Sequence, residues 1–339
     1  MPPVSSILRQ LSDRRDLSER DAQAAIGSIM RGESSESEMA SLFTAWKDKG
    51  VTVDELVGAA RAMRALATAL RVPPGILVDT CGTGGDGLGT FNISTIAAFA
   101  AAAAGARVAK HGNRGATSAC GSADLLTALG VTVDVEPEVV SRCLEEVGIG
   151  FLYAPRFHTA MRHVAPVRRQ LGFRTIFNLL GPLTNPAGAA CQIVGVSDEQ
   201  LVATMAEALR RLGARHALVV RGDDGLDEVS TTAPTRLVEL VKGQLVSYST
   251  APEALGVSRV SLDQLRGGDP VQNARIALDV LEGRPGAHRD AVLVNAGCAL
   301  YVGEAAGDIT SGIELARRAL DNGRARQKLE QLKAMTTAR

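Results

Sequence analysis

The sequence has few of the residues that bind nucleic acids or cross membranes. Aromatic residues make up only 3% of the chain, which leaves little material for stacking on single-stranded nucleic acid. Lysine plus arginine and aspartate plus glutamate both number 37, so the formal net charge of zero indicates no polyanionic partner. The longest apolar stretch, near residues 96–106, is too short to span a bilayer, and the N-terminal residues become charged before a signal-peptide core can form. We expect no nucleic-acid partner and no membrane partner.

Cysteines are also few, and their spacing is not that of a disulfide framework or a zinc site. Five occur, at positions 81, 120, 143, 191 and 298, which is an odd number without a C-x-x-C pair. Free thiols are typical of a reducing compartment, so we expect a cytoplasmic protein.

Two patterns along the chain predict two domains. Within residues 1–72, a Ser or Thr at positions 18, 35 and 52 is followed three residues later by Asp or Glu, and each pair precedes a helix-like run. From residue 73, Val- and Ile-rich runs alternate with helical patterns, which predicts parallel strands covered by helices. The fold class is therefore α/β: a small N-terminal helical domain over residues 1–72, rejoined by helices near 162–186, and a larger α/β domain over residues 73–339 with a mostly parallel central sheet. We also expect a hairpin over residues 235–250 and a mostly helical tail from residue 269.

A glycine-rich segment, CGTGGDGLGTFNIST at residues 81–95, lies between a predicted strand and a predicted helix. The free N–H groups of such a turn and the positive end of the helix dipole suit a phosphate. A dinucleotide site would need an acidic residue about 20 positions further on, where this chain has Lys110 and His111. A nucleoside-triphosphate loop would need Lys-Ser or Lys-Thr after the glycines, and neither follows.

The charges after this turn indicate which phosphate compound it holds. No Asp or Glu occurs between residues 87 and 123, so the segment favours anions. Asp86, inside the turn, suits a sugar hydroxyl or a metal ion, and we interpret the ligand as a phosphorylated sugar. On the glycines alone, an ordinary tight turn stays open as an alternative.

Four motifs in a fixed order extend this interpretation to nearly the whole chain. They are GTGGD at 82–86 with NIST at 92–95, KHGNR at 110–114 with GSAD at 121–124, VRRQLGFRTIFNLLGPLTNP at 167–186, and GLDEVS at 225–230. Together they resemble the anthranilate phosphoribosyltransferase family of tryptophan biosynthesis. The resemblance implies an enzyme that transfers the phosphoribosyl group of phosphoribosyl pyrophosphate to the amine of anthranilate, with Mg²⁺, giving N-(5-phosphoribosyl)anthranilate and pyrophosphate. It also implies a homodimer joined through the helical domains.

The resemblance assigns residues of this sequence to three sites. The phosphoribosyl pyrophosphate site would comprise Gly82, Thr83, Gly84, Gly85, Asp86, Thr90, Asn92, Ser94, Thr95, Lys110 and Ser122. The anthranilate site would comprise Gly82, Asn113, His158 and Arg168, and the metal site Ser94, Asp227 and Glu228. No residue is expected to act as a general acid or base. Lys110 and the metal would stabilise the charge that grows on the leaving pyrophosphate.

Three of these assignments also rest on side-chain chemistry. A guanidinium such as that of Arg168 binds a carboxylate through two hydrogen bonds. Mg²⁺ with pyrophosphate needs one or two carboxylates, which Asp227 and Glu228 supply. Taken alone, the DDGLDE segment would be an ordinary solvated turn. Arg174 lies near Arg168 in sequence and receives no role.

Departures from the family pattern occur in two segments. Residues 115–120 read GATSAC, so that Ala119 stands where the family usually has a lysine, and Thr159 stands where it usually has a proline. These changes put the affinity for phosphate or anthranilate in doubt, but not the reaction class. Two other functions stay open from the sequence: a pyrimidine nucleoside phosphorylase of the same architecture, and a nucleic-acid-binding, non-enzymatic relative.

Overall fold

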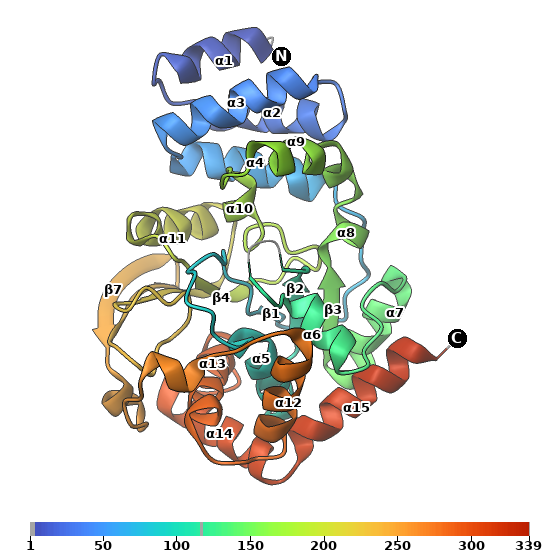
Figure 1. Ribbon diagram of the computed structural model, residues 1–339, viewed down its shortest axis with the longest axis vertical. Helices are drawn as coiled ribbons and strands as arrows, with labels where there is room; N and C mark the ends of the chain where they lie inside the picture. Colours follow the sequence, from blue (N-terminus) through green and yellow to red (C-terminus); the bar gives the residue numbers. More distant parts are fainter. Residues whose placement is uncertain (1–3, 116–117, 339) are drawn as a thin grey trace.

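A seven-stranded sheet organises the larger part of the molecule (Figure 1). The computed structural model describes residues 4–115 and 118–338 of the chain. The strands are β1 (Val78–Asp79), β2 (Val108–Gly112), β3 (Ile149–Tyr153), β4 (Cys191–Gly195), β5 (His216–Gly222), β6 (Thr235–Val241) and β7 (Gln244–Thr250). Their order is β3-β2-β1-β4-β5-β6-β7, parallel from β3 to β5 and antiparallel from β5 to β7. The predicted α/β class with a mostly parallel sheet is confirmed, and β6 with β7 forms the predicted hairpin.

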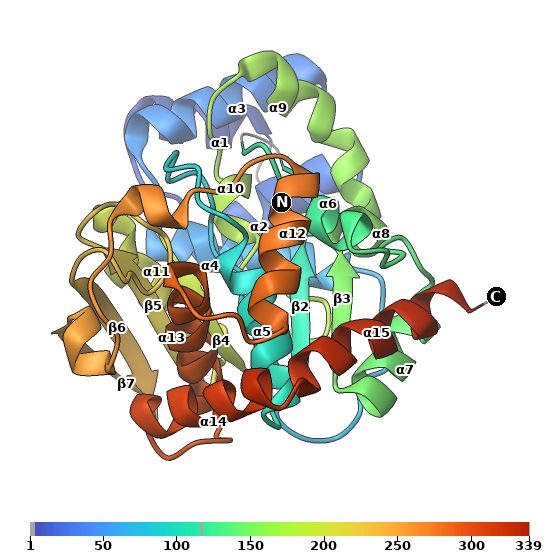
Figure 2. The same ribbon diagram turned by 60° about the horizontal axis from the view of Figure 1, so that its bottom comes forward.

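Helices from several parts of the chain surround this sheet (Figure 2). They are α5 (Ile93–Ala103), α6 (Ser122–Ala128), α7 (Pro137–Arg142), α8 (Ala154–Phe157), α11 (Val202–Arg211), α12 (Pro270–Leu281), α13 (Ala287–Val302), α14 (Ile309–Asp321) and α15 (Arg324–Thr337). A π-helical turn spans Cys143–Val147, and short 3₁₀ turns span Thr159–His163, Glu199–Leu201, Pro252–Leu255 and Leu262–Leu265. The Ala-rich helix α5 packs against α13, α14 and α15, and every residue of it except Ser94 is buried. Small side chains allow these helices to approach closely.

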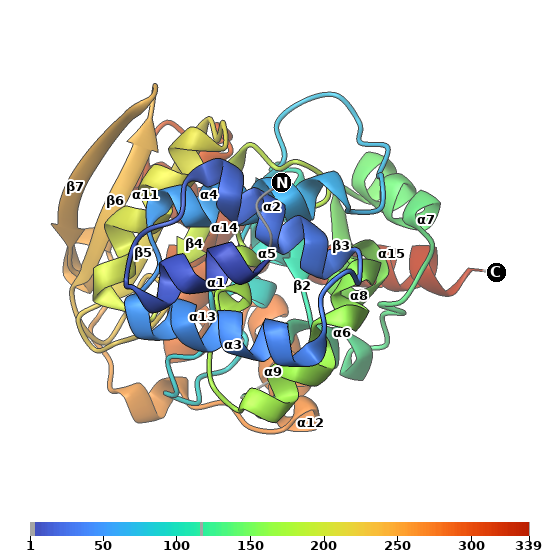
Figure 3. The same ribbon diagram turned by 90° about the horizontal axis from the view of Figure 1, so that it is seen from above.

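A bundle of helices forms a second layer above the sheet (Figures 1 and 3). Its N-terminal members are α1 (Val4–Ser12), α2 (Glu19–Met30), α3 (Glu36–Lys49) and α4 (Val53–Ala65). The side chain of Ser18 caps α2, and Ser35 and Thr52 form complete capping boxes at α3 and α4, which explains where these helices begin.

Two later helices, α9 (Ala165–Leu171) and α10 (Phe177–Leu180), share the core of this bundle. Helix α9 contacts α3, and α10 contacts α4. The ring of Phe43 in α3 meets that of Phe177 in α10 edge-on, at 5.6 Å between centroids. The segment between β3 and β4 therefore carries the chain from the sheet to the bundle and back.

Two further sequence expectations concern cysteines and membranes. All five cysteines are free, and four of them are buried. Within the described part of the chain, none of the helices combines the length and the apolar character needed to cross a bilayer.

Helices α13 and α14 cross where each has a glycine. A methyl group added to Gly312 would lie 2.4 Å from the carbonyl oxygen of Gly297, and one added to Gly297 would lie 2.4 Å from Cγ1 of Ile313. These distances are too short for van der Waals contact, so both positions need glycine.

We expect Gly312→Ala to lower the free energy of unfolding by about 1–3 kcal/mol, because the added methyl must push two packed helices apart. Urea denaturation of the variant and the parent chain measures this difference. Gly307→Ala is the matched control, since the same methyl at Gly307 meets no atom within 4 Å. Equal destabilisation by both changes would contradict the packing argument.

Candidate active site

The predicted site residues follow the carboxyl ends of the parallel strands. The glycine-rich turn follows β1, the KHGNR segment begins in β2, α8 follows β3, and the loop with Asp227 and Glu228 follows β5. Parallel strands end at the same edge of a sheet, so these segments converge. This edge faces α9 and α10 (Figure 1), and the ring nitrogen Nδ1 of His111 lies 3.0 Å from the carbonyl oxygen of Gly181, just after α10.

The glycine-rich turn is folded tightly against the end of β4. Four of its glycines have positive φ angles: Gly84 (66°), Gly85 (84°), Gly87 (73°) and Gly89 (68°). The N–H of Thr83 donates to the carbonyl oxygen of Gly195 at 2.8 Å. A methyl group on Gly82 would lie 3.1 Å from that oxygen and 3.3 Å from Oδ2 of Asp227. The turn therefore lies in contact with both β4 and the acidic loop.

The acidic loop brings carboxyl groups together beneath this turn. Burial raises the pKa of Asp227 far above its ordinary value, and repulsion from Glu228 and contact with Asp86 raise it further. Burial also raises the pKa of Glu228, to about 7. A donor set of clustered carboxylates that repel one another suits a hard divalent cation such as Mg²⁺, which would relieve the repulsion.

The N-terminus of α5 lies beside this cluster. The N–H of Ser94 donates to Oε1 of Glu228 at 3.1 Å, and its carbonyl oxygen accepts from the hydroxyl of Thr80 at 3.1 Å. The helix end that the sequence assigns to a phosphate thus receives the carboxylate of Glu228 in this structure. Both groups are anions, and the same amide geometry suits either.

Lys110 is buried behind the turn, where its side chain is 4% exposed as part of β2. Its ammonium donates to the carbonyl oxygen and to the hydroxyl of Thr80, both at 3.0 Å. The charge of Lys110 also opposes the effect of burial on the pKa values of Asp79 and Glu228. Lys110 therefore acts here as the counter-charge of buried carboxylates, and a direct bond from it to a phosphate stays a prediction.

Three other predicted phosphate ligands lie at or just before the start of α5. The amide nitrogen of Asn92 donates to the carbonyl oxygen of Cys120 at 2.9 Å, which ties the turn to the segment before α6. Thr90 forms an isolated antiparallel bridge with Arg266, and Thr95 is buried in the helix. These bonds fix the start of α5 on the sheet.

The loop after β2 closes on Ser122 at the start of α6. The N–H of Asn113 donates to the hydroxyl oxygen of Ser122 at 3.2 Å, and that hydroxyl donates to the carbonyl oxygen of Asn113 at 3.2 Å. The side chain of Asn113 is exposed, as is Ala119 at the position of the usual lysine. Residues 116 and 117, which also differ from the family pattern, lie outside the described residues. Thr159 is exposed and begins a 3₁₀ turn.

Arg168, on α9, has no acidic partner among the described residues. Its Nη2 donates to Oδ1 of Asn178 at 3.2 Å, and its guanidinium lies 5.8 Å from the ring centre of Phe177. Burial lowers the pKa of Arg168, and repulsion from Arg174 lowers it further. A partly buried cation held by a neutral amide suits an anionic ligand such as a carboxylate.

His158 and His111 form a buried pair of imidazoles near the same edge. Their ring centres lie 5.2 Å apart, and both nitrogens of His158 and Nε2 of His111 lack hydrogen-bond partners in the described structure. Burial lowers the pKa of His158 to about 3 and that of His111 to about 4. Both rings are therefore neutral at physiological pH, and their free nitrogens can bond a polar ligand.

Among the described residues, the three potential metal ligands whose donor atoms lie within 4.8 Å of one another are different ones, Asp79, Cys81 and His111, behind the turn. Both oxygens of Asp79 are already occupied, one by the N–H of His111 at 3.1 Å and one by the amide of Asn185 at 2.7 Å. Burial raises the pKa of the Cys81 thiol well above its ordinary value, so it stays protonated. We interpret this set as structural.

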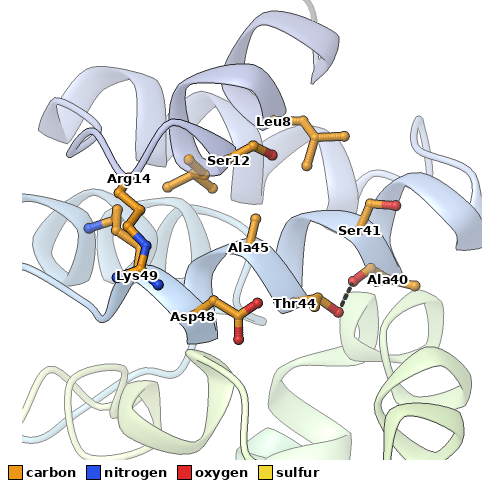
Figure 4. A pocket seen from close by; sticks show the side chains of 10 residues that line it. Leu8, Ser12, Arg14, Ala40, Ser41, Thr44, Ala45, Asp48 and Lys49 are labelled. Carbon is orange, nitrogen blue, oxygen red and sulfur yellow. Dashed lines mark hydrogen bonds between the residues drawn. The ribbon is translucent and has the colours of Figure 1, made fainter.

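A hollow of about 660 Å³ lies on the helical bundle, away from this edge of the sheet (Figure 4). It is lined by Leu8, Leu11, Ser12, Arg14, Ala40, Ser41, Thr44, Ala45, Asp48 and Lys49. None of the predicted site residues lines it.

The structure also shows two site neighbours that sequence reasoning missed, Arg174 and Asn178. Both lie in the motif at residues 167–186, but spacing within one motif does not show which distant segment a side chain reaches. Arg174 contacts the glycine-rich turn, 90 residues earlier in the chain, and Asn178 holds Arg168.

The neutral state of His158 predicts a pH dependence of stability. Because its pKa is about 3 in the folded protein and 6.5 in an exposed chain, unfolding between these values takes up a proton, and stability is lost as the pH falls. We expect His158→Gln to remove this proton uptake. Between about pH 6 and 4, the unfolding free energy of the parent should then fall more steeply than that of the variant, by about 1.4 kcal/mol per pH unit. Urea denaturation across this range measures the slopes, and parallel slopes would contradict a buried neutral imidazole.

The two layers match known domain families. Residues 74–326 match the glycosyl transferase family α/β domain, and residues 5–67 match the helical bundle domain of the same family. Anthranilate phosphoribosyltransferase of Symbiobacterium thermophilum is 51% identical, with 98% of each chain covered, and that of Rubrobacter xylanophilus is 53% identical over 95% of this chain and 94% of the relative.

Solved structures agree over the same length. The crystal structure of anthranilate phosphoribosyltransferase from Thermus thermophilus has a TM-score of 0.92 and 45% identity, covering 98% of this chain and 99% of that one. The enzyme from Saccharomyces cerevisiae in complex with PRPP and Mg has a TM-score of 0.91 and 28% identity, with 98% of each chain covered. The same enzyme in complex with 4-fluoroanthranilate has a TM-score of 0.88 and 26% identity over 98% of each chain. The chain therefore belongs to the anthranilate phosphoribosyltransferase family, and the resemblance first drawn from its four motifs is confirmed.

Proposed function

We propose that the protein transfers the phosphoribosyl group of phosphoribosyl pyrophosphate to the amine of anthranilate, giving N-(5-phosphoribosyl)anthranilate and pyrophosphate. One observation carries this proposal: a glycine-rich turn in contact with clustered carboxyl groups lies at the same sheet edge as Arg168, which has no acidic partner in the part of the chain that the structure describes. The first two features suit a sugar pyrophosphate with its cation, and the third suits an aromatic acid.

For phosphoribosyl pyrophosphate, we propose a site formed by the turn and the start of α5. It comprises Gly82, Thr83, Gly84, Gly85, Asp86, Thr90, Asn92, Ser94 and Thr95, with Lys110 and Ser122 completing the site. Positive φ angles in the turn let successive amides face one anion, which side chains larger than glycine would hinder. The amide of Ser94 is shared with Glu228, so an anion there would exchange with a carboxylate.

Asp227 and Glu228, with Ser94, are the residues we propose to hold Mg²⁺. The raised pKa values of both acids reflect the cost of keeping them charged when buried, which the charge of Lys110 offsets only in part for Glu228. Magnesium, when bound, neutralises charge on the leaving pyrophosphate. The chain's own part is to keep both carboxyl groups under the turn, through the contacts of Gly82 with Asp227 and of Ser94 with Glu228.

For anthranilate, we propose contacts from Arg168, Asn113, His158 and Gly82. Asn178 orients the guanidinium of Arg168. A carboxylate bound to this guanidinium would fix the orientation of the whole anthranilate ring and of its amine. An aromatic amine is a sufficient nucleophile once positioned, so no general base is required. Neutral His158 adds hydrogen-bonding capacity without a second positive charge.

We also propose a homodimer joined through the helical domains, in the cytoplasm. We propose that residues 1–72 and 162–186 form the helical domain and that the other residues from 73 to 339 form the α/β domain. Helices α9 and α10 share a buried cluster with α1–α4, which supports this division, and the same cluster continues into α11 and the strands β4, β5 and β6. The hollow between α1 and α3 offers the bundle a surface that a second copy can cover (Figure 4).

The loss of anthranilate fluorescence on addition of phosphoribosyl pyrophosphate tests the reaction directly. We expect consumption with Mg²⁺ and none with EDTA, and an Asp227→Asn, Glu228→Gln double variant should weaken the dependence on Mg²⁺ and slow turnover while remaining folded. An unchanged magnesium titration in the variant would remove these two residues from the site.

Failure of the folded parent protein to consume anthranilate would contradict the proposed reaction. Phosphorolysis of thymidine or uridine would then favour the nucleoside phosphorylase, and salt-sensitive retention on heparin would favour the nucleic-acid-binding relative.

We expect Arg168→Ala to raise the KM for anthranilate about tenfold or more and the KM for phosphoribosyl pyrophosphate much less, because one partner of a charged hydrogen bond is lost. Steady-state kinetics with each substrate varied in turn measures both values. Arg169→Ala is the matched control, since Arg169 is the exposed neighbour on the same helix. A similar rise in both KM values would place Arg168 outside the anthranilate site.

A further inference from the structure

Arg174 links the helical layer to the glycine-rich turn. It lies in the connection between α9 and α10, whose hydrophobic residues belong to the core of the bundle. Its Nη1 donates to the carbonyl oxygen of Gly84 at 2.7 Å, and its Nη2 to that of Thr83 at 3.3 Å. The two nitrogens of one planar group thus hold two successive carbonyls of the turn.

The absence of a side chain at Gly85 lets this guanidinium approach the turn. A methyl group added to Gly85 would lie 1.4 Å from Nη1 and 2.6 Å from Cζ of Arg174, so the exposed Arg174 side chain lies directly against that glycine. The hydroxyl of Ser197, after β4, donates to the same Gly84 oxygen at 3.2 Å. Gly84 is therefore held from the bundle and from the sheet at once.

This contact has an electrostatic consequence for an anion site. Carbonyl oxygens carry partial negative charge and repel a phosphate, whereas amide N–H groups attract it. With the Thr83 and Gly84 carbonyls bonded to a cation, the neighbouring amides are left to face the ligand. Without that bond, a turn with four glycines of positive φ has many competing conformations.

Arg174 also lies close enough to Arg168 to affect it. Repulsion from Arg174 is the second cause, after burial, of the lowered pKa of Arg168. One residue therefore contacts the turn proposed for phosphoribosyl pyrophosphate and lies near the cation proposed for anthranilate.

We propose that Arg174 is a positioning residue, which holds the glycine-rich turn in the shape that binds the pyrophosphate of phosphoribosyl pyrophosphate. This inference rests on the proposed function of the same site. Arg174 pre-organises the turn. Loss of the Arg174 side chain therefore reduces the fraction of molecules whose turn is ready to bind, and the apparent affinity for phosphoribosyl pyrophosphate weakens in proportion.

The test compares Arg174→Ala with Arg174→Lys and with the control Arg169→Ala, at a position that is exposed as Arg174 is, by calorimetric titration of phosphoribosyl pyrophosphate with Mg²⁺ and by steady-state kinetics. We expect Arg174→Ala to weaken binding and raise the KM for phosphoribosyl pyrophosphate about tenfold or more, with a change below about threefold in the KM for anthranilate. Arg174→Lys, which keeps the charge but has one ammonium in place of the fork, should fall between the two. Arg169→Ala should match the parent protein.

A nearly unchanged KM for anthranilate in Arg174→Ala shows that this variant is folded, and a second variant tests the same Gly84 oxygen from the side of the sheet. Ser197→Ala removes the other donor to Gly84 while Arg174 remains, and we expect a smaller rise in the same KM. An unchanged affinity in Arg174→Ala, or an equal rise in both KM values, would overturn the role of Arg174. If the parent protein does not use anthranilate, but Arg174→Ala binds phosphoribosyl pyrophosphate more weakly than the parent does, the proposed function is overturned and this inference stands.

Discussion

The absence of a side chain at Gly195 allows three segments of the site to meet. Gly195 is the last residue of β4, and a methyl group there would lie 1.5 Å from the carbonyl oxygen of Asp227. The carbonyl oxygen of Gly195 accepts the N–H of Thr83. The acidic loop and the glycine-rich turn thus come together on the end of one strand. Any larger residue would separate the carboxylates from the turn that they face.

Charge balance explains how so many ionisable groups are accommodated at this edge. Carboxyl groups converge from β1, the turn and the acidic loop, and the side chain of Lys110 opposes the cost of burying two of them. The N-terminus of α5 supplies a further positive end to Glu228. Arg168 and Arg174 lie close enough to repel each other, so positive charge gathers there. The site therefore combines a cluster of carboxyl groups with a pair of arginines, an arrangement suited to a cation, a pyrophosphate and a carboxylate bound together.

Local patterns predicted the fold because they depend on neighbouring residues. The caps at Ser18, Ser35 and Thr52 and the alternation of strands and helices require only short windows of sequence. The contacts of Arg174 with Gly84 and of Gly195 with Asp227 join segments that are far apart in the chain, so no local pattern indicates them. Lys110 is a further example of a contact that no local pattern indicates. Its sequence motif suggests a phosphate ligand, whereas its hydrogen bonds to Thr80 depend on how β1 and β2 pair. Burial decides which groups are charged, and a sequence alone does not give burial.

The packing of α5 divides the site into a stiff part and a pliable part. Because its small side chains are buried against three other helices, the axis of α5 has no room to shift, and the amides at its start are fixed in place. The turn before it has glycines that impose little on the backbone, so its shape depends on the bonds from Arg174 and Ser197 that hold it. Within the described residues, the hydrogen bonds from this turn to the helical layer come from one planar side chain, that of Arg174, so any adjustment of the turn to an arriving ligand passes to that layer through Arg174.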